Sequence, residues 1–146
     1  MELGLPGLDQ LWSVAAPVVA ADIILVHAGT NDLLQGQFST AASDLEVLIR
    51  SLNYYNPTAR ILVAKIIPFS GPYESLNSQV FWFNIAVDNL VQSLKAQGWS
   101  RLDVVDMNTY FPKAIGLGAD GIHPNDTGYW WMAQAWKQAI TAVGCN

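Results

Sequence analysis

The sequence is poor in basic residues and in long apolar runs. It has seven Lys and Arg among 146 residues, against twelve Asp and Glu, which gives a net charge of −5. No basic cluster is present for nucleic acid or an anionic membrane surface, so neither is expected as a partner. The most apolar stretch, residues 14–28, is interrupted by Pro17 and Asp22. It is shorter than the roughly 20 residues that a membrane-spanning helix needs.

The sequence also has only one cysteine, and its first residues do not have the pattern of a signal peptide. The only cysteine is Cys145, which excludes a disulfide within this chain. It is read either as an exposed thiol or as half of a disulfide to a segment not included here. The opening residues, Met-Glu-Leu-Gly-Leu-Pro, lack the basic start of a signal peptide.

The sequence has enough hydrophobic residues to form a core. The chain is 51% hydrophobic and 13% charged, and its length predicts one domain spanning residues 1–146. Short β-rich apolar runs alternate with segments of helical periodicity. Strands are predicted at residues 22–28, 60–67 and 102–107, and helices at 40–54, 77–97 and from after Pro124 to about Val143.

Three strand–helix units in series predict a parallel sheet with right-handed crossovers, in a flavodoxin-like, three-layer α/β sandwich. In such sheets, ligands bind beyond the carboxyl ends of the strands. Two polar motifs fall there. Gly29-Thr30-Asn31-Asp32 directly follows the first predicted strand, and Asp120-Gly121-Ile122-His123 lies in the loop after the third.

The second motif has the composition of an acid–base pair. Asp120 stands three residues before His123 on a turn that contains Gly121, so its carboxylate can reach the imidazole Nδ1 and leave Nε2 free as a general base. Pro124 keeps His123 out of the helical conformation. The alternative is a helix-capping loop in which His123 is an ordinary surface residue.

The first motif is a polar turn at the tip of a buried strand. Asn31 can aim an amide N–H at a developing oxyanion, while Asp32 is expected to brace the turn through backbone hydrogen bonds. The alternative is an ordinary Asx-type turn without catalytic meaning.

Taken together, the two motifs resemble the SGNH (GDSL-type) hydrolases, and the likeness extends from Leu5 over nearly the whole chain. That family has a Gly-Asp-Ser block, a Gly block, a Gly-x-Asn-Asp block and an Asp-x-x-His block, and this chain matches the last two. The sequence of the two motifs and their flanks is most similar to that of carbohydrate esterases of the acetyl xylan esterase type. The resemblance implies a secreted ester hydrolase in which His123 is the base, Asp120 orients it and Asn31 donates to the oxyanion.

The chain departs from the family at the nucleophile. It contains no Gly-Asp-Ser, and Ser13 is the only serine before Gly29. By resemblance, the first two strands of a five-stranded sheet are missing, so the nucleophile is expected from another segment or a partner chain. A small or polysaccharide ester is the expected substrate. No metal or organic cofactor is expected, because one His–Asp pair cannot fill a zinc shell.

Two further expectations compete with or follow from this interpretation. The chain could be a non-catalytic remnant that binds carbohydrate or another chain. Loss of two strands would also leave the segment 22–28 as an apolar sheet edge, which favours self-association unless the first 20 residues cover it.

Several individual side chains have simpler alternatives. His27 is predicted as a hydrogen-bonded core residue. Asn84 is read as a satisfied buried amide or as a brace for the active-site loop, and Trp131 as a sugar-stacking or partly covered surface residue. The core face of the last helix is predicted to hold Tyr129, Met132, Ala133, Trp136, Ile140 and Val143.

Overall fold

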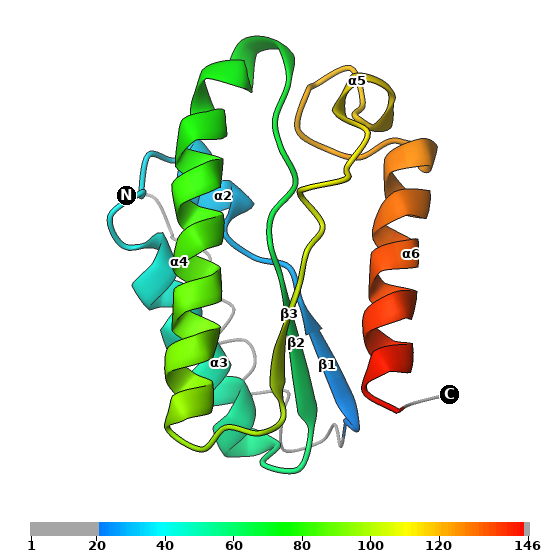
Figure 1. Ribbon diagram of the computed structural model, residues 1–146. Coiled ribbons are helices and arrows are strands. Elements are labelled where there is room, and N and C mark those ends of the chain that lie inside the picture. The colour runs from blue at the N-terminus through cyan, green and yellow to red at the C-terminus, as the bar shows by residue number, and fades with distance from the viewer. Residues whose placement is uncertain (1–20, 145–146) are drawn as a thin grey trace.

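A computed structural model describes residues 21–144, and its centre is a three-stranded parallel sheet (Figure 1). The strands are β1 (Ile23–Val26), β2 (Arg60–Ala64) and β3 (Leu102–Val105), in the order β1-β2-β3. Ile24 pairs with Ile61, and Val63 pairs with Val104. Each strand therefore lies beside the next one in the chain, as the predicted crossovers require.

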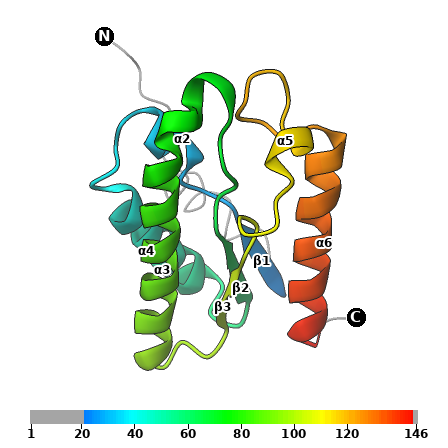
Figure 2. The same cartoon turned by 45° about the horizontal axis from the view of Figure 1, so that its top comes forward.

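Helices cover both faces of the sheet, which confirms the three-layer sandwich. The helices α3 (Ala41–Tyr55) and α4 (Asn77–Ala96) lie on one face, and α6 (Asp126–Ala142) lies on the other (Figures 1 and 2). The three long helices begin and end within two residues of their predicted limits. Three short elements were not predicted: α2 (Thr30–Leu34), the 3₁₀-helix η2 (Gly71–Leu76) and α5 (Lys113–Gly116).

The central strand shows why its sequence is apolar without alternation. Ile61 and Val63 belong to the core under α3 and α4, whereas Leu62 and Ala64 belong to the core under α6. All four side chains are at most 1% exposed. A strand covered on both faces needs apolar residues at every position, which is typical of parallel sheets.

The edge strand β1 is less well covered, and the prediction for His27 is wrong. Alternation along the strand places Ile23, Leu25 and His27 on the α6 side of the sheet. Ile23 packs against the core under α6, but Leu25 is 43% exposed and His27 is also exposed. The helix α6 packs over β2 and β3 and reaches only the beginning of β1, so this histidine lies outside the core.

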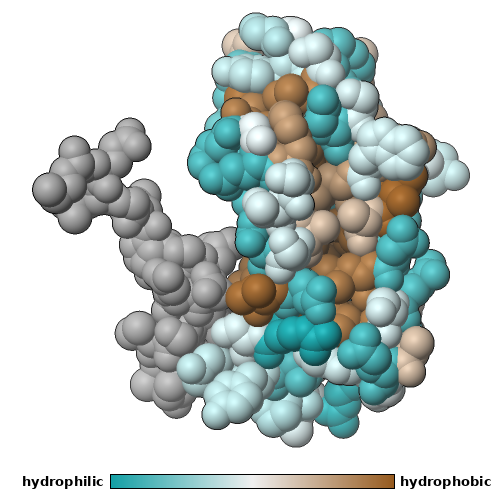
Figure 3. Space-filling model, turned by 90° about the vertical axis from the view of Figure 1, so that its left-hand side faces the viewer, coloured by the Kyte–Doolittle hydropathy of each residue, from teal (hydrophilic) through white to brown (hydrophobic). Residues whose placement is uncertain are grey.

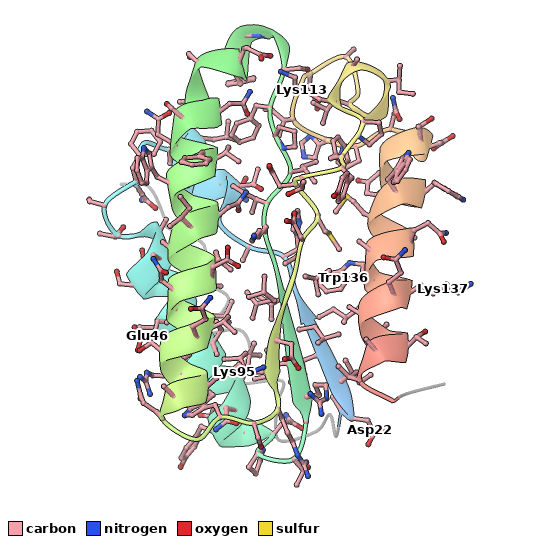
Figure 4. The ribbon with its side chains drawn as sticks, in the orientation of Figure 1. Asp22, Glu46, Lys95, Lys113, Trp136 and Lys137 are labelled. Atoms are coloured by element: carbon pink, nitrogen blue, oxygen red, sulfur yellow. The ribbon has the colours of Figure 1, made fainter. Side chains whose placement is uncertain are left out.

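The sheet-facing stripe of α6, which is partly buried, is rotated from the predicted one. Met132, Trp136, Ile140 and Val143 pack against the sheet as predicted, but Ala135 and Ala139 join them in place of Tyr129 and Ala133, which are exposed. Figure 4 shows the Trp136 side chain pointing from α6 towards the sheet and Lys137 pointing away. Helical periodicity alone does not determine which of two adjacent stripes meets the sheet.

Some predictions concern residues outside the described range. Ser13 and the rest of residues 1–20 lie there, as does Cys145, so their interpretations stay predictions. Among residues 21–144, no helix combines the length and apolar character needed to cross a bilayer.

Candidate active site

The Asp120 carboxylate and the His123 imidazole are hydrogen-bonded to each other. The distance from Asp120 Oδ2 to His123 Nδ1 is 2.7 Å. The other carboxylate oxygen, Oδ1, accepts from the backbone N–H groups of Ile122 at 2.9 Å and His123 at 3.0 Å. One oxygen thus folds the turn while the other orients the ring. The predicted contact between the two side chains is present.

The electrostatics of the pair suit a permanently charged orienting group. The N–H of Ile122, followed by the His123 side chain and backbone, lowers the pKa of the Asp120 carboxyl to about 2. Asp120 is therefore ionised at any pH at which an esterase would work. The His123 side chain is 73% exposed, so its Nε2 is open to a reacting group. With a proton held on Nδ1 by Asp120, Nε2 can accept one.

Asn125 anchors this loop to α6. Its Oδ1 accepts from the N–H of Gly128, so Asn125 is the N-cap of this helix. Its Nδ2 also donates to the carbonyls of Ile115 and Leu117, at 2.9 Å each. His123 itself is tied in by its carbonyl, which accepts from the N–H of Gly118 at 2.8 Å. No pattern in the sequence predicts the two donor bonds to Ile115 and Leu117.

The first motif forms a short helix and not a loop turn. Gly29 is buried and precedes α2, and Asn31 is exposed in the first turn of that helix. Its N-cap residue is Gly29, so no side chain caps this helix. Asn31 lies in α2, which follows the carboxyl end of β1, and His123 lies between α5 and α6, in the chain that follows β3. Figure 1 shows α2 and α5 at the same end of the sheet.

An apolar groove lies beside α2. It has a volume of about 230 Å³ and runs between α4 and the segment from α2 to α3. Figure 3 shows brown, apolar side chains gathered on this face, flanked by teal, polar ones. Leu33, Phe38, Trp82 and Phe83 are among the lining residues.

Two larger hollows lie elsewhere on the described residues, and neither has a histidine in its lining. The first has a volume of about 520 Å³ and lies near the amino ends of β2 and β3. The second has a volume of about 620 Å³ and lies between β2, β3 and the end of α6. Chemistry therefore assigns the candidate site to the Asp120–His123 loop, whatever the size of these hollows.

Asn84 fits the prediction of a satisfied buried amide. It is 6% exposed, and its side chain accepts from the N–H of Ile66 at 2.9 Å and donates to the carbonyl of Ile66 at 3.0 Å. Asn108 donates to the same carbonyl at 2.8 Å. The side-chain amides of Asn84 and Asn108 thus hold the backbone at Ile66, two residues after the end of β2.

Neither a serine partner for His123 nor a metal-binding cluster is found among the described residues. Within residues 21–144, no serine hydroxyl is hydrogen-bonded to the His123 ring, whose partner is Asp120. No three His, Cys, Asp or Glu side chains in that range are arranged to hold a metal ion.

Comparison with known proteins agrees with the two motifs. The sequence model of the GDSL-like lipase/acylhydrolase family matches residues 3–131. The chain belongs to this family. No curated protein matches it significantly.

Several solved structures share the fold of this chain. A family 3 carbohydrate esterase from Talaromyces cellulolyticus is 24% identical with a TM-score of 0.70, over 84% of this chain and 58% of that protein. A serine mutant of an acetyl esterase, solved with acetate ion, is 25% identical with a TM-score of 0.69, over 84% and 60% of the two chains. A family 3 carbohydrate esterase from Clostridium thermocellum is 22% identical with a TM-score of 0.67, over 84% and 57%. The chain thus spans less than two thirds of each of these proteins.

Proposed function

We propose that this chain supplies the general base and an oxyanion donor of a serine ester hydrolase that removes acetyl or short acyl groups from carbohydrate or small esters. The observation that carries the proposal is the 2.7 Å hydrogen bond between Asp120 Oδ2 and His123 Nδ1. The family membership and the carbohydrate esterases among its structural relatives support it. Since polysaccharide esters lie outside cells, we place this activity in the extracellular space.

The reaction follows from the roles of the three residues. A serine from a segment or chain not described here attacks the ester carbonyl, and His123 Nε2 takes its hydroxyl proton. Asn31 donates an amide N–H to the oxyanion that forms. His123 then returns the proton to the departing alcohol, which leaves an acyl-serine. His123 Nε2 then takes a proton from water, which attacks this ester, and gives that proton to the departing serine oxygen, so that the acid is released and the serine hydroxyl is restored.

The chain as given should therefore hydrolyse esters poorly. Removal of a triad serine typically lowers the rate by about 10⁶. We expect turnover of 4-nitrophenyl acetate near background, and strong turnover when the chain is extended upstream to include an in-frame Gly-Asp-Ser. His123→Ala should abolish the activity of the extended protein. His27→Gln is the matched control, because it removes the other exposed imidazole and should leave activity unchanged.

Two outcomes would contradict the proposal. Strong turnover by the chain alone that His123→Ala abolishes would point to an unrecognised serine, with Ser70 and Ser13 the first to replace. An extended protein that carries Gly-Asp-Ser but hydrolyses no acetyl ester would exclude the esterase.

A second candidate is a module that binds carbohydrate without cleaving it. A groove of about 160 Å³ runs between α6 and the chain after β3, and it combines aromatic with amide side chains: Tyr110, Phe111, Trp131, Gln134 and Gln138. Tyr110 is 80% exposed and Trp131 is 41% exposed. Aromatic rings beside amide hydrogen-bonding groups suit a sugar ring, which has apolar C–H faces and polar edges.

A further inference from the structure

The chain after β2 touches the turn that carries the candidate catalytic pair. The N–H of Ser70 donates to the carbonyl of Gly121 at 2.9 Å. Gly121 lies between Asp120 and Ile122, so this bond joins the middle of the turn to a different part of the fold. Figure 1 shows the segment after β2 rising beside the loop that leads from α5 to α6.

The two backbones are so close that only glycine fits at position 121. A β-carbon there would lie 2.3 Å from the Ser70 carbonyl oxygen and 2.9 Å from its carbonyl carbon. Gly121 also has a φ of +72°, a conformation that side chains disfavour. The obstacle is backbone, which cannot rotate away as a side chain could.

Ser70 is itself held in place by α4. The side chain of Asn77, the first residue of α4, accepts from the N–H of Phe69 at 2.8 Å and donates to its carbonyl at 2.9 Å. Phe69 is fully buried. One amide side chain thus fixes both polar groups of the residue before Ser70, and the position of Ser70 follows from the rigid start of α4.

We propose that Asn77 and Gly121 are positioning residues for the Asp120–His123 pair. The helix α4 fixes Phe69 and Ser70 through Asn77, and Ser70 fixes Gly121 at the distance where the Asp120 carboxylate meets His123 Nδ1. Asp120 and His123 have side chains that are 49% and 73% exposed. Water competes for such an exposed contact, which contributes little by itself, so its geometry depends on the support of the surrounding backbone.

The catalytic meaning of this support rests on the proposed function, but the test reads the pair directly. Two NMR measurements report on it: the pKa of the Asp120 carboxyl by ¹³C titration, and the tautomer of His123 by ¹⁵N shifts. In the native chain, Asp120 should titrate at about 2 and the neutral His123 ring should carry its proton on Nδ1.

Gly121→Ala should disrupt both signatures. The pKa of Asp120 should rise by about one unit, a tenfold change in proton affinity. The His123 proton should move towards Nε2, the tautomer that a free imidazole favours. The matched control is Gly36→Ala: Gly36 has a φ of +75°, and an added β-carbon there meets nothing within 4 Å. It imposes the same backbone strain without the collision and should leave both signatures native.

Asn77→Ala tests the other end of the support and covers the case in which Gly121→Ala fails to fold. It should change both signatures in the same direction, whereas Ser78→Ala, one residue further along α4, should not. Native signatures in a folded Gly121→Ala or in Asn77→Ala would overturn the proposal. Neither measurement uses an ester, so an inactive extended enzyme with native signatures would count against the esterase and not against this inference.

Discussion

The phenyl ring of Phe83 occupies the space that a β-carbon on Gly29 would need. The two positions are 2.3 Å apart, measured from the added carbon to Phe83 Cζ. Gly29 has a φ of +117°, so both the backbone conformation and the packing require glycine at the start of the Asn31 motif. Because Phe83 belongs to α4, this helix supports the Asn31 motif as well as the Asp120–His123 loop.

Gly29→Ala should therefore destabilise the fold more than the same change at an open position. Overpacking costs about 1–3 kcal/mol and a left-handed backbone about 1–2 kcal/mol, so the free energy of unfolding should fall by about 2–5 kcal/mol. Gly36→Ala, with strain but no collision, should lose only about 1–2 kcal/mol. Urea unfolding of both variants measures the difference.

A double-mutant cycle separates the collision from the strain. Phe83→Leu shortens the side chain that the new methyl meets, so the double variant should lose less than the sum of the two single losses. Strict additivity would show that the ring moves aside without cost and would contradict the steric argument.

The low pKa of Asp120 predicts a specific acid sensitivity. The folded state holds this pKa at about 2, below the ordinary value of 3.8, so the charged carboxylate stabilises the fold at neutral pH. This contribution is complete above about pH 4 and is lost as the pH falls towards 2. Asp120→Asn should flatten the fall in unfolding free energy over that interval, as urea titrations at pH 2, 3, 4 and 7 would show.

His123→Ala distinguishes the causes of this low pKa. The N–H of Ile122 is the largest cause, and it remains in that variant. The acid sensitivity should therefore shrink only in part. If it vanished as completely as in Asp120→Asn, the imidazole and not the turn would be the main stabilising partner of the carboxylate.

We also propose that the chain self-associates through β1. This strand is at the edge of the described sheet, and Leu25 on it is 43% exposed. Apolar edge strands pair readily with other chains, and a two-fold dimer is the commonest result. Leu25→Lys should lower the mass found by light scattering at micromolar concentration, whereas Val47→Lys, at an exposed position of α3, should not.

One result would contradict self-association through β1. A native monomer whose Ile23 and Leu25 amides are protected from hydrogen exchange would show that residues 1–20 cover the edge, and the association would be wrong.

The groove beside α6 predicts weak carbohydrate binding. Trp131→Ala should weaken binding of an acetylated xylo-oligosaccharide by roughly tenfold, equivalent to about 1.4 kcal/mol, in an NMR titration. Trp82→Ala is the control, since Trp82 is 66% exposed but lines the other groove. Equal affinity in the native chain and Trp131→Ala would remove this groove from consideration as a sugar site.

The sequence predicted those features that depend on local patterns. Apolar runs located the three strands found within residues 21–144, and the spacing of Asp120 and His123 predicted their hydrogen bond. It did not predict that His27 is exposed, because exposure at β1 depends on how far α6 reaches across the sheet. It also missed Asn77 and the second role of Asn125, because a side chain that bonds to a distant backbone leaves no periodic signal.

The helix α6 holds no fully buried apolar side chain, since Gly128 is its only buried residue, whereas α3 and α4 each hold several. Helices with little buried apolar surface are the first to open in native-state fluctuations. Asn125 and His123 stand at the start of this helix, so its detachment would free the base while the sheet and the opposite layer stay folded. Heating should then inactivate an enzyme built on this chain before it melts, and amides of α6 should exchange with solvent sooner than those of α4.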